Sequence, residues 1–189
     1  QVINVLPPNS GGTRDVVFGI GHTNRSETFL PKTAEDTERD AYGPFAYCDC
    51  PGFKDNRWVE VNIANAVNIR RVLTQAQSVR LVLLIPYDAL KISLERGGAL
   101  SSLLETCTQL FGTREKLEFH KESILLGVTH VPLDKKLESV RKKFVKNASD
   151  TAIAQMFAAR MFLYDPMDRG NSTFSNREAI KRQIALLKP

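Results

Sequence analysis

The run Val79–Ile85 places the strongest constraint on the fold of this chain. Its sequence, Val-Arg-Leu-Val-Leu-Leu-Ile, is nearly continuous in apolar, branched side chains and lacks polar alternation. A strand of this kind is buried on both faces, which is typical of the central strands of parallel sheets. Because parallel strands need long crossover connections, usually helices, the run predicts a sheet that is covered by helices.

Other apolar runs and amphipathic stretches alternate along the chain. Three further runs predict strands at Phe45–Cys48, Ser123–Val128 and Met161–Tyr164. Helical spacing of apolar residues predicts helices at Val59–Gln77, Leu100–Phe111, Leu137–Val145, Thr151–Arg160 and Asn176–Leu187. The predicted inward face of the first helix carries Ile63, Ala66, Val67, Leu73 and Ala76. This order predicts an α/β fold: one domain over residues 1–189, with three layers and helices on both faces of an open, mostly parallel sheet.

Two N-terminal segments have no sustained periodicity. Gln1–Leu6 is too short to classify, and either a strand or the end of a helix fits it. Gly19–Gly43 is mostly polar and is predicted to be a long loop, which in a compact domain usually has a function. The chain begins with glutamine, so we expect it to be part of a longer protein.

A short motif follows the predicted strand Phe45–Cys48. Asp49 is expected at the strand's end, and Pro51 and Gly52 then break the strand. A carboxylate there can hold Mg²⁺, directly or through water, and glycine lets a backbone N–H approach a phosphate. The alternative, an ordinary strand followed by a Pro-Gly turn, stays open on these residues alone.

Polar residues also follow the other predicted strands. They are Tyr87-Asp88, Thr129-His130 and Asp165. In an open α/β sheet, ligands bind at the carboxyl ends of the strands, so these residues predict a ligand site at one edge of the sheet.

Composition limits the partners and the compartment. The formal net charge is +5, but acidic and basic residues are interleaved, which favours a solvated surface over a nucleic-acid interface. The densest basic cluster, between Lys135 and Lys146, is expected on the polar face of a helix. Three cysteines, Cys48, Cys50 and Cys107, indicate reduced thiols and a cytoplasmic protein. No apolar run approaches the ~20 residues that span a bilayer.

Several short motifs occur in an order that resembles one protein family. Asp49-Cys50-Pro51-Gly52-Phe53 matches a switch II motif, and Ser26-Glu27-Thr28 resembles the Ser-x-Thr of a switch I loop. Leu110-Phe111-Gly112 resembles the end of a helix in the same family, and Thr129-His130 resembles its base-reading motif. Over about Val16–Tyr164 the chain resembles P-loop GTPases of the septin-related branch, which holds the immunity-associated (GIMAP) and chloroplast Toc GTPases.

The resemblance implies a Mg²⁺-dependent switch domain that binds GTP and GDP and hydrolyses GTP slowly. By this resemblance, Thr28 is a catalytic residue and a Mg²⁺ ligand, and Asp49 is the second Mg²⁺ ligand. Gly52 contacts the terminal phosphate, and Thr129 and His130 hold the purine, with the histidine ring flat against it. A second copy of the domain or a partner protein across the nucleotide is expected to assist hydrolysis, because Phe53 stands where many GTPases have a water-orienting glutamine.

Two further departures from the family pattern leave alternatives open. No Gly-x-x-x-x-Gly-Lys-Ser/Thr occurs, and family spacing would put Gln1–Leu6 in the helix after that loop. The missing strand, which normally lies between Phe45–Cys48 and Val79–Ile85, is then expected upstream of the chain. Pro132 stands where the guanine-reading aspartate is expected, and nearby Asp134 is predicted to cap a helix. The alternative function is a pseudo-GTPase that acts as a nucleotide-independent interaction module.

Overall fold

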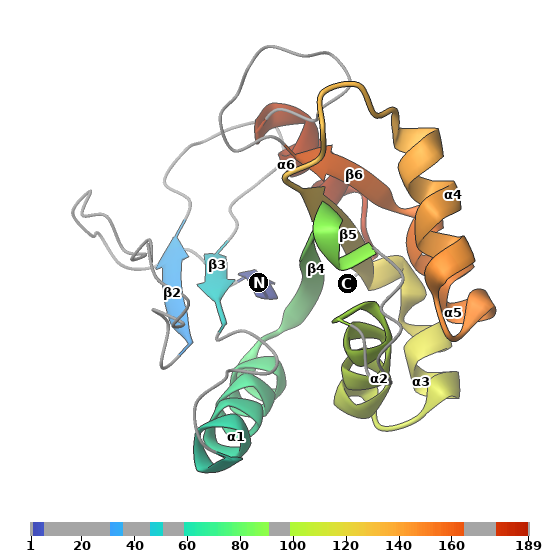
Figure 1. Cartoon of the computed structure of the whole chain (residues 1–189). Coiled ribbons are helices and arrows are strands. Elements are labelled where there is room, and N and C mark those ends of the chain that lie inside the picture. Colours follow the sequence, from blue (N-terminus) through green and yellow to red (C-terminus); the bar gives the residue numbers. More distant parts are fainter. Residues whose placement is uncertain are drawn as a thin grey trace. The chain divides into compact units, whose positions relative to one another are not determined.

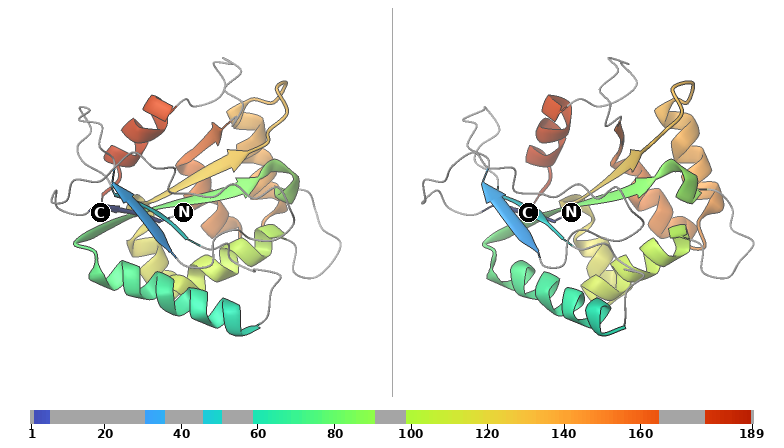
Figure 2. Two further views of the ribbon diagram at one scale, coloured as in Figure 1. Left: turned by 90° about the vertical axis from the view of Figure 1, so that its left-hand side faces the viewer. Right: turned by 60° about the vertical axis from the view of Figure 1, so that its left-hand side comes forward.

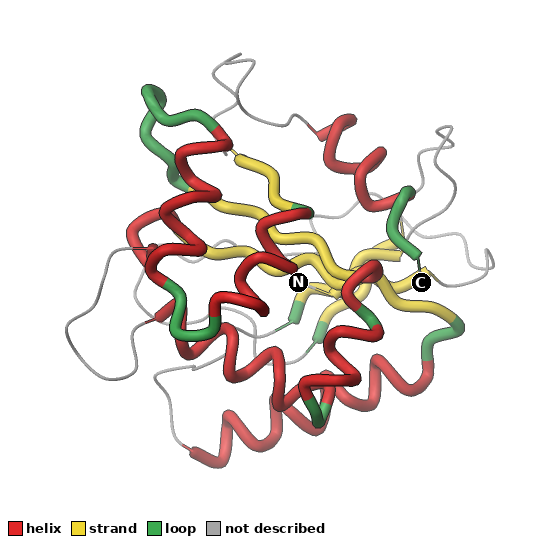
Figure 3. Tube along the Cα trace, turned by 90° about the vertical axis from the view of Figure 1, so that its right-hand side faces the viewer, coloured by secondary structure: helices red, strands yellow, loops and turns green. Residues whose placement is uncertain are grey.

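The computed structural model describes residues 2–5, 31–35, 46–50, 59–90, 99–164 and 177–188; the remainder is drawn in grey (Figure 3). The chain divides into two compact units, residues 1–81 and 82–188, and the border falls within strand β4 (Ser78–Pro86).

The described part of the first unit contains three short strands, the start of β4 and one helix. The strands are β1 (Val2–Val5), β2 (Lys32–Glu35) and β3 (Ala46–Asp49), and the helix is α1 (Val59–Gln75). Their order is β2-β3-β1-β4, and each neighbouring pair is antiparallel. Because β1 runs opposite to both of its neighbours, β3 and β4 run in the same direction. Figure 1 labels β2, β3, β4 and α1.

Two sequence predictions for this unit are wrong. Val2–Val5 is a strand, not the helix that family spacing assigns to Gln1–Leu6, and it lies between β3 and β4 where the upstream strand was expected. Lys32–Glu35 is also a strand, although Gly19–Gly43 was predicted to be a loop. The four residues of β2 are mostly exposed, so pairing with β3 rather than apolar periodicity makes them a strand.

Helix α1 buries a different face from the predicted one. Ile63 and Val67 are 61% and 53% exposed, whereas Asn65 and Ile69 are buried. Residues two positions apart on a helix lie about 200° apart, so these two pairs occupy opposite faces and only one can face the unit's interior. Of the predicted inward face, Leu73 and Ala76 are half-buried.

The second unit is an α/β structure with a three-stranded parallel sheet. The end of β4 is followed by β5 (Ile124–Thr129) and β6 (Met161–Tyr164), in the order β4-β5-β6. β5 and β6 pair in parallel from Leu126↔Met161 to Thr129↔Tyr164, and β4 and β5 point the same way (Figure 2). All residues of β5 before Thr129 are buried, as expected of a strand with both faces covered.

Helices flank this sheet, with α6 on one face and α2 on the other (Figure 2). The helical elements of the second unit are η1 (Tyr87–Leu90), α2 (Ala99–Phe111), α3 (Arg114–Phe119), η2 (Lys121–Ser123), α4 (Leu137–Asn147), α5 (Thr151–Ala159) and α6 (Arg177–Ala185). α2, α4, α5 and α6 confirm predicted helices, whereas α3 and the two 3-10 turns were not predicted. Side chains from all three strands and from the helices around them form the core; the largest fully buried ones include Phe144, Leu126, Leu163 and Leu117.

Local signals explain where several helices end or begin. Gly112 ends α2 with a φ of +87°, in the left-handed region where glycine has no steric penalty, as its position predicted. Thr113 caps α3 by accepting a hydrogen bond from the Lys116 amide, and Asp150 caps α5 by accepting one from the Ile153 amide. Among the helices of the described ranges, none is both long and apolar enough to cross a bilayer.

Candidate functional site

The carboxyl edge of the parallel sheet in the second unit carries the residues that sequence analysis selected there. Thr129 is the last residue of β5 and pairs with Tyr164, the last residue of β6. Tyr87 and Asp88 follow the last residue of β4 directly. Because the three strands are parallel, these residues share one edge, which is where α/β sheets bind ligands. Asp165 lies outside the described residues.

Thr129 and His130 form a locally ordered pair at this edge. His130 is exposed and has a φ of 54°, an uncommon left-handed conformation for a residue with a side chain. Its Nδ1 lies 3.1 Å from the Thr129 hydroxyl oxygen, within hydrogen-bond distance. The hydrogen bond restrains the ring, and the exposed faces of the imidazole remain able to stack on a planar ligand.

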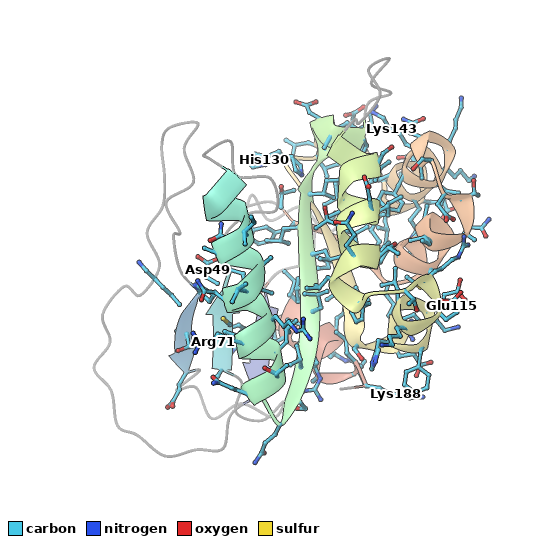
Figure 4. The ribbon with its side chains drawn as sticks, turned by 90° about the horizontal axis from the view of Figure 1, so that it is seen from below. Asp49, Arg71, Glu115, His130, Lys143 and Lys188 are labelled. Atoms are coloured by element: carbon cyan, nitrogen blue, oxygen red, sulfur yellow. The ribbon has the colours of Figure 1, made fainter. Side chains whose placement is uncertain are left out.

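A tyrosine and a cluster of charges border the same end of the unit. The ammonium of Lys143 on α4 lies 4.2 Å from the centre of the Tyr87 ring, a cation–π contact. Figure 4 shows Lys143 and His130 towards one end of this unit, with Glu115 and Lys188 towards the other. Lys143 belongs to the basic cluster that was predicted to face only water, so this contact is a feature that sequence analysis missed.

Asp134 does not cap a helix as predicted. The N-cap of α4 is Lys136, and Asp134 instead accepts a hydrogen bond from Lys135 at 2.6 Å. This hydrogen bond lowers the pKa of the Asp134 carboxyl and raises that of the Lys135 ammonium. The only carboxylate near Pro132 in sequence is therefore already paired with a cation.

Asp49 belongs to the first unit and is the last residue of β3, as predicted. The residue is half-buried, and Lys32 on β2 lies directly opposite it in the antiparallel register. Side chains of directly opposed residues have Cβ atoms ~4.5–5.5 Å apart, so a cation is available beside this carboxylate. A carboxylate at the end of a strand suits a hard divalent cation such as Mg²⁺.

Two thiols flank Asp49 in sequence. Cys48 is buried, Cys50 is half-buried, and their sulfur atoms lie 3.9 Å apart. The contact with Cys50, together with burial, raises the pKa of the Cys48 thiol. Cys107 on α2 is fully buried, and this burial raises its pKa to about 12. None of the three forms a disulfide in the structure.

The other predicted site residues cannot be placed against these. Thr28, Gly52, Phe53 and the Gly-rich Ser10–Thr13 lie outside the described residues. Within the ranges that are described, no three His, Cys, Asp or Glu side chains gather closely enough to hold a metal ion together.

Comparison with known proteins gives no assignment: the scan of protein families, the search of curated proteins and the search of solved structures each find no match.

Proposed function

We propose that this chain is a guanine-nucleotide-binding switch domain that depends on Mg²⁺ and hydrolyses GTP to GDP and phosphate slowly. The observation that carries the proposal is the position of Asp49, a half-buried carboxylate at the carboxyl end of β3 and at the start of an Asp-x-Pro-Gly motif. The P-loop GTPase resemblance of the sequence supplies the identity of the nucleotide.

Asp49 and Thr28 would hold Mg²⁺ in the bound state. The ion would neutralise phosphate charge, and Gly52 would place a backbone N–H near the terminal phosphate. Lys32 lies opposite Asp49 in the strand register, so its positive charge would oppose the approach of Mg²⁺ to this end of β3.

Thr129 and His130 would hold the purine by stacking and by restraint of the imidazole ring. The hydrogen-bond distance from His130 Nδ1 to the Thr129 hydroxyl favours one ring orientation before any ligand binds. Discrimination of guanine from adenine would be weaker than in GTPases with a free carboxylate at this position, because Pro132 accepts no hydrogen bond through its side chain and Asp134 is paired with Lys135.

Binding of fluorescent GTP and ATP analogues to the full-length protein, with and without Mg²⁺, tests the proposal. We expect Mg²⁺-dependent binding with GTP preferred, and a loss of about 10–100-fold in Asp49→Asn. Glu105→Gln, on the exposed surface of α2, is the matched control for loss of one negative charge and should bind as the parent does. Equal binding of both nucleotides would remove the guanine assignment, and no binding would remove the nucleotide function.

A second candidate function is a protein-interaction module that needs no nucleotide. It is favoured by the exposed side chains of Ile63 and Val67, which lie one turn apart on α1. This candidate predicts a melting temperature that does not respond to GTP analogue and Mg²⁺, whereas the switch domain predicts a rise.

A further inference from the structure

Cys48 and Cys50 form a close pair of thiols on either side of Asp49. Cys48 lies in β3 and Cys50 directly follows its last residue, Asp49, and the two sulfur atoms are 3.9 Å apart. Strands paired on both sides hold this segment: Cys48 lies opposite Thr33 on β2 and opposite Val2 on β1.

The geometry permits a disulfide with a small movement of the backbone. Two residues of extended strand advance about 6.6 Å, which is at the upper end of the ~4.4–6.8 Å that separates Cα atoms in disulfides. The sulfur atoms must close to ~2.05 Å, so the end of β3 must shorten when the bond forms. Shortening a strand at its last residues disturbs its pairing least, because no further register follows Lys32↔Asp49.

Burial gives the two thiols different roles. Cys50 is half-buried and can meet a small oxidant, whereas Cys48 is 1% exposed and can be reached only by its neighbour. An accessible attacking thiol with a buried resolving thiol beside it is the arrangement that converts a mixed disulfide into an intramolecular one.

We propose that Cys48 and Cys50 are a reversible modification site, which a low-molecular-weight disulfide of the glutathione class oxidises to an intramolecular disulfide. The sulfur of Cys50, after its proton leaves to water, attacks one sulfur of the oxidant and expels one thiolate. The Cys48 thiol then gives up its proton to water or to the first thiolate, and its sulfur attacks Cys50 in the mixed disulfide and expels the second thiolate. Both thiolates take up a proton, so two electrons pass from the cysteine pair to the oxidant and two small thiols are formed.

The disulfide would act on the candidate Mg²⁺ ligand, a consequence that depends on the proposed nucleotide function. Asp49 lies between the two bonded residues, so shortening of the strand would move its carboxylate relative to β2. We expect Mg²⁺-dependent nucleotide binding to weaken about 10-fold or more on oxidation, and to recover when a dithiol reductant is added.

Mass spectrometry of the full-length protein tests the disulfide without reference to nucleotide. The protein is equilibrated with reduced and oxidised glutathione at several ratios, quenched in acid, alkylated and digested. We expect one peptide in which Cys48 and Cys50 have together lost two hydrogens and are protected from alkylation, while Cys107 is alkylated once the chain is denatured.

Single variants separate the two thiols' roles. Cys48→Ala should stop at the glutathione adduct on Cys50, Cys50→Ala should give no reaction, and Cys107→Ala, the matched control, should oxidise as the parent does. A parent protein that accumulates only the glutathione adduct, or links through two chains instead of one, would overturn the proposal. The mass of the oxidised parent protein is enough to decide whether the disulfide forms, so the test does not depend on any variant folding.

The nucleotide arm uses the same oxidised and reduced samples. If the reduced protein binds no nucleotide, the proposed function fails while the mass measurement still decides the disulfide. If the reduced protein binds nucleotide and full oxidation leaves the affinity unchanged, the regulatory consequence is wrong.

Discussion

Replacement of Gly127 by alanine tests how tightly the parallel sheet of the second unit is packed. Gly127 lies in the middle of β5, and a Cβ there would lie 2.5 Å from the Phe162 ring and 2.7 Å from a Leu84 methyl. Carbon atoms in contact are normally ~3.5–4.0 Å apart, so the added methyl overlaps the ring by about 1 Å.

The magnitude follows from two opposing terms. Overpacking of this size typically costs about 1–3 kcal/mol because buried side chains must leave their rotamers. Alanine also restricts the unfolded chain relative to glycine, which stabilises by about 0.4–1 kcal/mol where the backbone tolerates it. Leu84 is 40% exposed and can rotate away, but Phe162 is 3% exposed and cannot. We therefore expect Gly127→Ala to lower the free energy of unfolding by about 1–2 kcal/mol.

Urea denaturation of four proteins measures this: the parent, Gly127→Ala, Phe162→Leu and the double variant. Phe162→Leu should lower the unfolding free energy of the parent, because a buried ring is lost. In Gly127→Ala the same substitution should lower it by at least ~1 kcal/mol less, because leucine lacks the ring atoms that the added methyl overlaps. Gly112→Ala is the control, since no atom lies within 4 Å of its added Cβ and only its φ of +87° opposes alanine. If Gly127→Ala is neutral, or if Phe162→Leu costs the same in both backgrounds, the close packing inferred at β5 is wrong.

Three other predictions concern caps, pH and strain. Asp150→Ala removes both the cap of α5 and the carboxylate that accepts hydrogen bonds from Arg114, so unfolding free energy should fall by about 1–2 kcal/mol, and by less in Asp150→Asn, which keeps a capping oxygen. The hydrogen bond from Lys188 lowers the pKa of Glu122. The ionised Glu122 carboxylate therefore stabilises the fold above the ordinary value of 4.5, and this stabilisation is lost as pH falls through the lowered pKa. Urea denaturation at several pH values should show a smaller acid-dependent loss of stability in Glu122→Gln than in the parent. His130→Gly should raise unfolding free energy by about 1 kcal/mol by relieving left-handed strain while weakening purine binding, and a loss of stability would contradict this account of its backbone.

Sequence periodicity was sufficient for the second unit because its signals are local. The strand at Val79–Ile85 differs from β4 (Ser78–Pro86) by one residue at each end, and Met161–Tyr164 is the same in both. Gly112 was predicted to end a helix and does end α2, because its left-handed backbone favours glycine. The α/β class with a three-stranded parallel sheet is therefore confirmed. The prediction of a mostly parallel sheet is wrong for the first unit, where the pairs β2-β3, β3-β1 and β1-β4 are antiparallel. The finer P-loop GTPase assignment and the single-domain organisation stay predictions.

The first unit was harder because its strands depend on partners distant in sequence. Lys32–Glu35 has no apolar alternation, and only pairing with β3 identifies it as a strand. Helix α1 contains apolar residues on opposite faces, so the amphipathic pattern does not decide whether Ile63 or Ile69 is buried. The carboxylate of Asp49 was placed correctly at a strand end, but the opposing Lys32 could not be found before the register of β2 was known.

The left-handed backbone of His130 is a feature that the Thr-His motif did not predict. Val131, the next residue, is 7% exposed, so the chain must turn sharply at the end of β5 to return a side chain to the core. A glycine would make this left-handed turn without the ~1–2 kcal/mol that a side chain costs there. The histidine adds no burial of its own, because it is exposed and its ring contacts the adjacent Thr129 hydroxyl. Strain retained at an exposed strand end, with no gain in packing, favours a role for the imidazole in binding a ligand at this edge.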